Sequence, residues 1–158
     1  MEAVIFTSDL LQELDKITVK YDDKKAALLP VLHAVQEKEG LISTTTEQNI
    51  AEYLGIPAVH IHEVVSFYHL FHTVKKGKCH FSVCQTTACA LLGGEDIIEH
   101  IKSRLGIKHG ETTPDGKFSL STVECLGACE LAPVMQLGKE YKGFLNKKMI
   151  DEMIEKYK

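Results

Sequence analysis

Hydrophobic residues in the first half of the chain recur every three to four positions, which is the spacing of amphipathic helices. Two such stretches come first, and their apolar positions are Leu10, Leu11, Leu14 and Ile17, followed by Ala27, Leu28, Val31, Leu32 and Val35. Pro30 stands in the first turns of the second stretch, where proline is tolerated, and Gly40 ends that stretch. The pattern therefore predicts two amphipathic helices.

Two further helices are expected before residue 77. Residues 44–47, Thr-Thr-Thr-Glu, have the form of a capping box and open a short helix that stops at Gly55. Pro57 then takes a first helical position and starts a fourth helix. The expected apolar side of this helix consists of Val59, Val64, Phe67, Leu70 and Phe71. Together the four helices predict a small bundle.

After Gly77 the hydrophobic residues form short runs separated by turn residues. The runs at 80–83 and 118–123 predict strands, and each is followed by a loop that contains cysteines. Between them, residues 95–105 predict a helix whose core face is Ile97, Ile98, Ile101 and Leu105. Residues 134–137 and 141–144 predict a hairpin turned at Gly138 and Lys139, and a last helix is expected from Asn146 to Tyr157.

A β-α-β unit followed by β-β-α is typical of a thioredoxin-like sandwich. We therefore predict a mixed chain of the α+β or α/β class. A small helical bundle is expected at residues 1–76, and a thioredoxin-like domain at residues 77–158.

Composition narrows the function classes. The 158 residues are 44% apolar and 25% charged, which excludes a disordered, collagen-like or coiled-coil chain. Arg104 is the only arginine and the net charge is −4, so we expect no nucleic-acid partner. No apolar run approaches the roughly 18 residues of a membrane span, and residues 1–11 carry no cation of a signal peptide. We expect an intracellular, cytoplasmic protein without direct membrane insertion.

Five cysteines stand out in a chain of this length. Cys84 and Cys89 form one close pair, and Cys125 and Cys129 form a second. Small residues separate the members of each pair, so that sulfur atoms can converge and backbone N–H groups can reach them. In a reducing compartment, such cysteines are more often metal ligands or redox groups than disulfides.

The spacing leaves alternatives open. Zinc sites accept gaps of two to four residues within a pair, whereas the tight steps of a bacterial [4Fe–4S] motif are absent. The plant-type [2Fe–2S] pattern needs a third cysteine where this chain has Leu92. A [2Fe–2S] cluster with one iron held by each pair, a zinc site and unrelated core thiols remain. A thioredoxin-type C-x-x-C is missing, and Cys79 is expected to be a small buried hydrophobe.

Several motifs together resemble a known family. They occupy residues 84–94, 124–136, 29–32, 35–40 and 64–68. In these motifs the chain resembles the thioredoxin-like [2Fe–2S] subunit of the NADH dehydrogenase module of respiratory complex I. Related subunits occur in NAD-reducing and electron-bifurcating hydrogenases and in NAD-dependent formate dehydrogenases. The resemblance extends over roughly residues 25 to 157.

The resemblance implies a thioredoxin-like [2Fe–2S] ferredoxin domain with one cluster on Cys84, Cys89, Cys125 and Cys129. It also implies a larger partner subunit that binds FMN and NADH. The chain would then carry single electrons within an NADH-linked oxidoreductase and have no active site of its own.

Two other functions compete with this prediction. Residues 50–59 have the look of a helix-turn-helix with Gly55 at the turn, which suggests an iron–sulfur redox sensor that binds DNA. Residues 58–69, the would-be recognition helix, contain no Lys, Arg, Asn or Gln to read base edges. The second competitor is a structural zinc module.

The remaining residues of interest have simpler interpretations. Gly93 and Gly94 are expected to be turn glycines. The histidines are expected to be packing or solvent residues, and they include the pairs His60/His62 and His69/His72. The group Phe67, Tyr68, Leu70 and Phe71 exceeds what one helix face needs, so half of it is expected to contact a partner.

Overall fold

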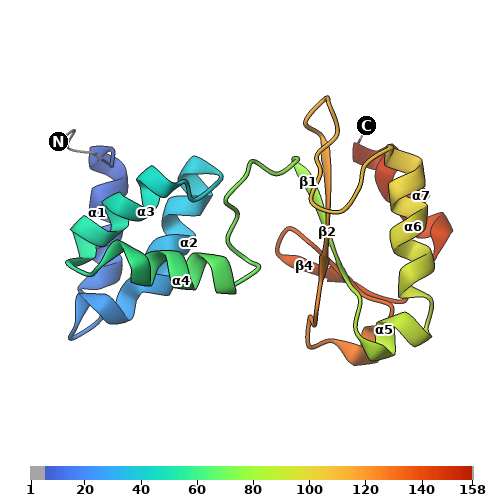
Figure 1. Ribbon diagram of the computed structural model, residues 1–158, viewed down its shortest axis with the longest axis horizontal. Coiled ribbons are helices and arrows are strands. Elements are labelled where there is room, and N and C mark those ends of the chain that lie inside the picture. The colour runs from blue at the N-terminus through green and yellow to red at the C-terminus, as the bar shows by residue number, and fades with distance from the viewer. Residues whose placement is uncertain (1–5, 158) are drawn as a thin grey trace. The chain divides into compact units, whose positions relative to one another are not determined.

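The computed structural model describes residues 6–157, and the chain divides into two compact units, residues 1–75 and 76–158 (Figure 1). Each unit has its own hydrophobic core. Residues 1–5 lie outside the described residues. They include the start of the segment 1–11, whose charge was compared with that of a signal peptide. None of the helices in residues 6–157 combines the length and the apolar character needed to cross a membrane.

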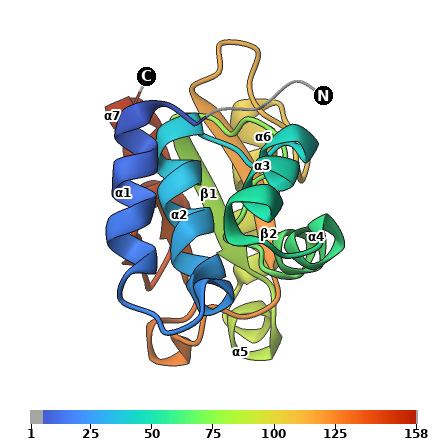
Figure 2. The same cartoon turned by 90° about the vertical axis from the view of Figure 1, so that its left-hand side faces the viewer.

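The first unit is a bundle of helices. Its elements are α1 (Ser8–Thr18), the 3-10 turn η1 (Lys24–Ala27), α2 (Leu28–Glu39), α3 (Thr44–Leu54) and α4 (Ala58–Phe67). Helices α1 and α2 lie side by side, and α3 packs against α4 (Figure 2). Leu14, Leu32, Ile50 and Ile61 are completely buried between them, and each stabilises the fold by about 2 kcal/mol. Gly40 and Gly55 end α2 and α3 with positive φ angles of 81° and 67°, at the predicted positions.

The start of α3 differs from the predicted capping box. Ser43 is the N-cap, and its hydroxyl accepts a hydrogen bond from the N–H of Thr46 at 3.0 Å. Glu47 is one position too late to complete the box. Its buried carboxylate instead lies within 3.2 Å of the Nδ1 atom of His62 on α4. The prediction was wrong by one residue because serine and threonine both act as N-caps and four of them stand in a row at residues 43–46.

The buried face of α4 also differs from the prediction. Pro57 is the N-cap rather than the first helical residue, and Ile61 and Val65 face the core. Val59 and Phe67, which were assigned to the core side, are 58% and 78% exposed. Because α4 is apolar on more than one side, its periodicity does not select a single face.

The second unit contains a four-stranded mixed sheet in the order β2-β1-β3-β4. Its strands are β1 (Cys79–Cys84), β2 (Phe118–Val123), β3 (Met135–Leu137) and β4 (Glu140–Lys142). Strands β1 and β2 run parallel, whereas β3 pairs antiparallel with both β1 and β4. This mixed α+β architecture confirms the predicted fold class.

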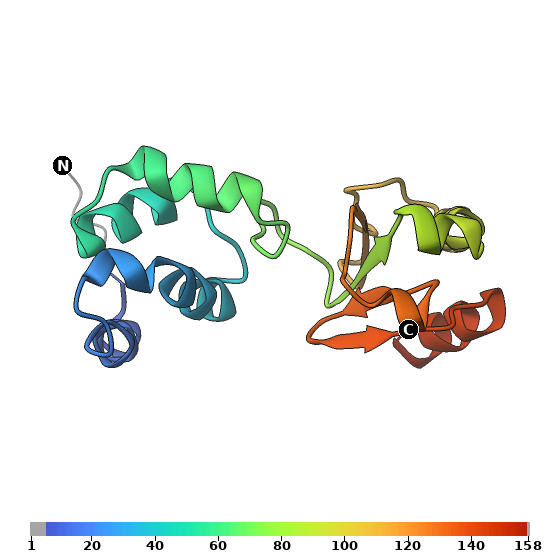
Figure 3. The same ribbon diagram turned by 90° about the horizontal axis from the view of Figure 1, so that it is seen from below.

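Helices α6 (Gly94–Leu105) and α7 (Lys147–Tyr157) cover one face of the sheet (Figures 1 and 3). Phe81, Leu120 and Met135 from the strands are fully buried together with Ile101 and Ile150 from the helices. The predicted core face of α6 is confirmed for Ile97, Ile98 and Ile101. The main core of this unit therefore lies between the sheet and these two helices.

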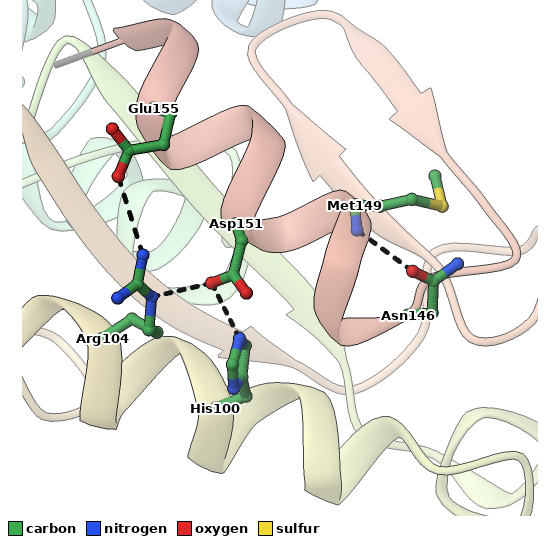
Figure 4. Close-up of polar contacts among 6 residues, drawn as sticks. All are labelled: His100, Arg104, Asn146, Met149, Asp151 and Glu155. Atoms are coloured by element: carbon green, nitrogen blue, oxygen red, sulfur yellow. Dashed lines mark hydrogen bonds and ion pairs between the residues drawn. The ribbon is translucent and has the colours of Figure 1, made fainter.

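A polar cluster joins α6 to α7 (Figure 4). One carboxylate oxygen of Asp151 accepts a hydrogen bond from Nε of Arg104 at 2.7 Å and lies 3.0 Å from Nε2 of His100. Desolvation raises the pKa of Asp151, but the bonds from His100 and Arg104 outweigh it and lower the pKa. Arg104 also reaches Glu155 at 3.6 Å. The sole arginine of the chain thus forms ion pairs within its own unit.

Candidate metal centre

Both cysteine pairs follow the carboxyl ends of neighbouring parallel strands. Cys84 is the last residue of β1 and pairs with Val123, the last residue of β2. The N–H of Gln85 still bonds to the carbonyl of Val123 at 3.0 Å, so the strands separate only beyond that point. Because parallel strands end at the same edge of a sheet, the two loops meet there, as ligand-binding loops of such sheets commonly do.

Each cysteine loop contains a short helical turn that the hydrophobic pattern did not predict. The five-residue helix α5 (Thr87–Leu91) carries Cys89, and the 3-10 turn η2 (Cys129–Leu131) begins at Cys129. Both are too short for hydrophobic periodicity to identify.

Gly94 has a more specific role than a turn glycine. A Cβ atom at this position would lie 2.8 Å from the carbonyl oxygen of Cys89, so only glycine lets α6 start this close to the first cysteine loop. Gly93, with a φ of 91°, fits the predicted turn. The sequence did contain a signal for this close approach, namely the second of two adjacent glycines, since a turn needs only one.

The two pairs have different exposure. Cys84 and Cys89 are buried in a small apolar cluster that is separate from the main core. Its other members are Val123, Leu126, Ala128, Ala132 and Val134. Cys125 and Cys129 are exposed. The site therefore has a dry side, made by the first loop, and a side open to solvent, made by the second.

Hydrogen bonds reach the sulfur atoms from both loops. The Sγ of Cys84 lies 3.2 Å from the hydroxyl of Thr86 and 3.6 Å from the carbonyl oxygen of Glu124, which precedes the second cysteine pair. The N–H of Gly127, which has a φ of 67°, donates to the Sγ of Cys125 at 3.3 Å. The loops thus surround the sulfur atoms with hydrogen-bond donors, the arrangement that stabilises thiolates and sulfide.

The two buried thiols have opposite pKa shifts. Burial raises the pKa of Cys84, but hydrogen bonds, led by that from Thr86, outweigh burial and lower the pKa. Burial raises the pKa of Cys89, and the neighbouring sulfurs of Cys84 and Cys129 raise it further. Cys84 is therefore the first of the two to become a thiolate, and sulfurs of both loops are close enough to interact.

The donor set fits an iron–sulfur cluster in its chemistry. All five cysteines are free thiols. Four of them lie in the two loops at one edge of the sheet, among apolar side chains and backbone donors. Within residues 6–157, however, no three His, Cys, Asp or Glu side chains form a group that could hold a single metal ion. The structure thus brings Cys84 and Cys89 into contact and places Cys125 and Cys129 on the adjoining loop.

Cys79 is separate from this site. It is buried in the main core at the opposite end of β1, which confirms the predicted packing role. Burial raises the pKa of its thiol to about 11, so that the thiol stays protonated at neutral pH.

The two histidine pairs singled out from the sequence and the aromatic group lie in the first unit. His60 contacts Glu63 at 3.1 Å, and His69 and His72 lie beyond the end of α4, so they share no helical face. The sequence predicted that half of the aromatic and apolar group at residues 67–71 lies in the core and half on the surface. Phe71 is buried, whereas Phe67, Tyr68 and Leu70 are exposed.

Known proteins match this chain in sequence. The model of the family described as thioredoxin-like [2Fe–2S] ferredoxin matches residues 14–158. A subunit of the NADH-quinone oxidoreductase of Rhizobium meliloti is 41% identical over 147 residues, 93% of this chain and 88% of the relative. NADP-reducing hydrogenase subunit HndA of Solidesulfovibrio fructosivorans is 32% identical over 156 residues, 99% of this chain and 91% of the relative.

A solved structure also has this fold. The match is to an NAD⁺-reducing [NiFe]-hydrogenase, with a TM-score of 0.68 and 21% identity, and it spans 80% of this chain and 22% of that chain. The resemblance inferred from the sequence motifs is confirmed.

Proposed function

This chain belongs to the thioredoxin-like [2Fe–2S] ferredoxin family, and from that premise we propose that it transfers single electrons as a small subunit of an NADH-linked multisubunit oxidoreductase. The observation that supports this most directly is the meeting of two cysteine loops at the carboxyl ends of β1 and β2. When bound, a [2Fe–2S] cluster supplies a site that accepts and releases one electron.

The proposed ligands are the four cysteines of the two loops. Cys84 and Cys89 would hold one iron, and Cys125 and Cys129 the other. The apolar cluster around the first pair excludes water from one side. Backbone donors, such as the N–H of Gly127, would tune the potential through hydrogen bonds to sulfur. The exposed second pair offers the shortest path for an electron to a partner.

The relatives support a role among other subunits, because both are named as subunits of larger enzymes. We assign FMN and NADH to a larger partner subunit, since this chain contains no G-x-G-x-x-G motif for a dinucleotide. The chain would be cytoplasmic and would meet the membrane only through the larger complex.

Metal analysis of anaerobically purified protein tests the proposal. We expect about two irons and two acid-labile sulfides per chain, with the visible absorption of a [2Fe–2S] protein. The absorption should bleach when the partner complex is supplied with NADH. A colourless protein with one zinc per chain would replace the proposal with the structural zinc module.

A further inference from the structure

Residues 143–145, between β4 and α7, lie against the second cysteine loop, and we call them the strap. The N–H of Phe144 donates to the carbonyl of Leu131 at 2.7 Å, and the N–H of Leu145 donates to the carbonyl of Pro133 at 3.0 Å. Two consecutive N–H groups of the strap therefore bond to the same loop and fix its backbone at two points.

Phe144 has an unusual backbone conformation that explains these bonds. Among residues 6–157 it is the only non-glycine residue with a positive φ, at 53°, which is an outlier for a bulky residue. Its ring is 65% exposed, so packing of the side chain does not account for the strain. Consecutive N–H groups of an extended strand point to opposite sides, whereas a residue in the left-handed region can turn them to the same side. The positive φ therefore lets the N–H groups of Phe144 and Leu145 face one loop.

Gly143 is required by the close approach of the strap to the loop. A Cβ atom at this position would overlap the Cβ of Leu131 and lie 2.7 Å from the carbonyl oxygen that accepts the bond from Phe144. Gly143 does not have a positive φ, so glycine is needed here for space. Gly94 has the same relation to the first loop, at the carbonyl oxygen of Cys89. Each cysteine loop is thus approached by one glycine at the turn that carries its second cysteine.

The strap connects the second loop to the main core of its unit. Leu145 is buried in the cluster between the sheet and the two helices. The next residue, Asn146, caps α7, because its side-chain carbonyl accepts a hydrogen bond from the N–H of Met149 at 3.0 Å (Figure 4). On the loop side, the N–H of Ala132 bonds to the carbonyl of Cys129 at 3.1 Å. A continuous series of contacts therefore leads from the main core through the strap to Cys129.

We propose that Gly143 and Phe144 are positioning residues for the metal centre, which hold the η2 turn and its Cys129 in place relative to the main core. The inference rests on the proposed function, in which Cys129 is a ligand. Within the exposed pair the strap fixes Cys129, whereas Cys125 is held inside the loop, by the N–H of Gly127. Because ligand orientation and hydrogen bonding set the potential of a cluster, a displaced Cys129 changes both its potential and its spectrum.

Gly143→Ala tests the strap against a matched control, Gly77→Ala. A Cβ atom at Gly77 would lie 2.5 Å from the carbonyl carbon of Phe118, at the opposite end of β1 from Cys84. Both substitutions overpack the same unit, so both should lower the Tm. Only Gly143→Ala should shift the visible circular-dichroism bands and the reduction potential of the anaerobically purified chain. Equal shifts in Gly77→Ala would show that both quantities follow stability and would overturn the positioning role.

A second pair of variants makes the test independent of overpacking, and it also serves if Gly143→Ala does not fold. Asparagine tolerates a positive φ, whereas a β-branched valine is a genuine outlier there, and both keep the N–H that bonds to Leu131. We expect Phe144→Val to shift the bands and the potential, and Phe144→Asn to leave both unchanged. Equal shifts in the two variants would assign the effect to the lost ring and overturn the role of the backbone.

Thiol labelling of the iron-free chain tests the position of Cys129 without the metal. Iodoacetamide rates, mapped by mass spectrometry, give the ratio of Cys129 to Cys125, in which Cys125 is the internal reference. We expect Gly143→Ala to raise this ratio about threefold, because a turn without its strap opens more often, and Gly77→Ala to leave it unchanged. An unchanged ratio in Gly143→Ala would overturn the proposal. Absence of iron and sulfide from the purified chain would refute the proposed function, whereas this ratio still decides whether the strap holds Cys129.

Discussion

The two cysteine loops use the same ligand type in opposite surroundings. Cys84 and Cys89 are buried beside the apolar residues that follow β1 and β2, whereas Cys125 and Cys129 are exposed. Spacing alone treats the pairs as equivalent. From this difference we infer that the first loop attaches the proposed metal site to the protein core, and that the second loop contacts a partner protein.

Replacing the cysteines one at a time is the strongest test of this comparison. Cys84→Ser and Cys89→Ser should lose nearly all iron and also lower the Tm, because a serine hydroxyl would be buried among apolar side chains. Cys125→Ser and Cys129→Ser should keep the Tm of the apo chain while they alter or abolish the visible absorption. Iron content and thermal unfolding measure both effects.

Cys79→Ala is the control, and it should retain about two irons per chain. Equal loss of Tm from the two pairs would remove the distinction between an anchoring loop and an exposed loop.

Two glycines extend the comparison to the backbone. Gly94→Ala places a methyl group 2.8 Å from the carbonyl oxygen of Cys89, and overpacking of this kind costs about 3 kcal/mol. Gly127→Ala meets nothing within 4 Å, and only its positive φ opposes the change, at about 1 kcal/mol. Denaturant unfolding measures both values. A larger cost at Gly127 would indicate that the second loop is the more tightly packed.

Alkaline pH distinguishes Cys79 from the four proposed ligands. Burial raises its pKa from 9.0 to about 11, so its stabilising contribution is complete below pH 9 and is lost as the pH rises through 11. The expected loss is about 3 kcal/mol. Cys79→Ala should flatten this part of the stability curve in denaturant titrations. A curve of the same steepness in the variant would assign the loss to other groups.

Thiol labelling of the iron-free protein should show the smallest difference. At neutral pH, Cys125 and Cys129 should react with iodoacetamide about tenfold faster than Cys89, because access and thiolate character set the rate. Cys79 should react last. Mass-spectrometric mapping of the labelled positions gives the rates. Cys89 labelling as fast as Cys125 would mean that the first loop opens readily without its metal.

The sequence predicted those features that a strong periodicity or a distinct motif encodes. The face of α6 carrying Ile97, Ile98 and Ile101 could be read from spacing, as could the strands that end at Cys84 and Val123. The family followed from two cysteine motifs in register. In each case several residues point to the same structure, so one ambiguous position does not change the prediction.

Other features depend on tertiary contacts that no local pattern records. The core side of α4 could not be chosen because Val59 and Ile61 are equally apolar, and packing against α3 selects Ile61. The unequal burial of the cysteine pairs depends on the apolar cluster around Val134 and Ala132, which includes Cys84 and Cys89 but leaves Cys125 and Cys129 outside. The positive φ of Phe144 arises from bonds to Leu131 and Pro133, which no preference of phenylalanine would suggest.

The hydrogen-bonded register of β1 with β2 has a consequence for how this unit can be reused. Cys84 and Val123 are paired partners at the ends of adjacent strands, so both cysteine loops hang from one ladder inside residues 76–158. Because the whole site lies in a single unit, this unit can be combined with other domains and keep the site. The hydrogen bonds between β1 and β2, which set the distance between the two cysteine loops, stay the same in any such combination.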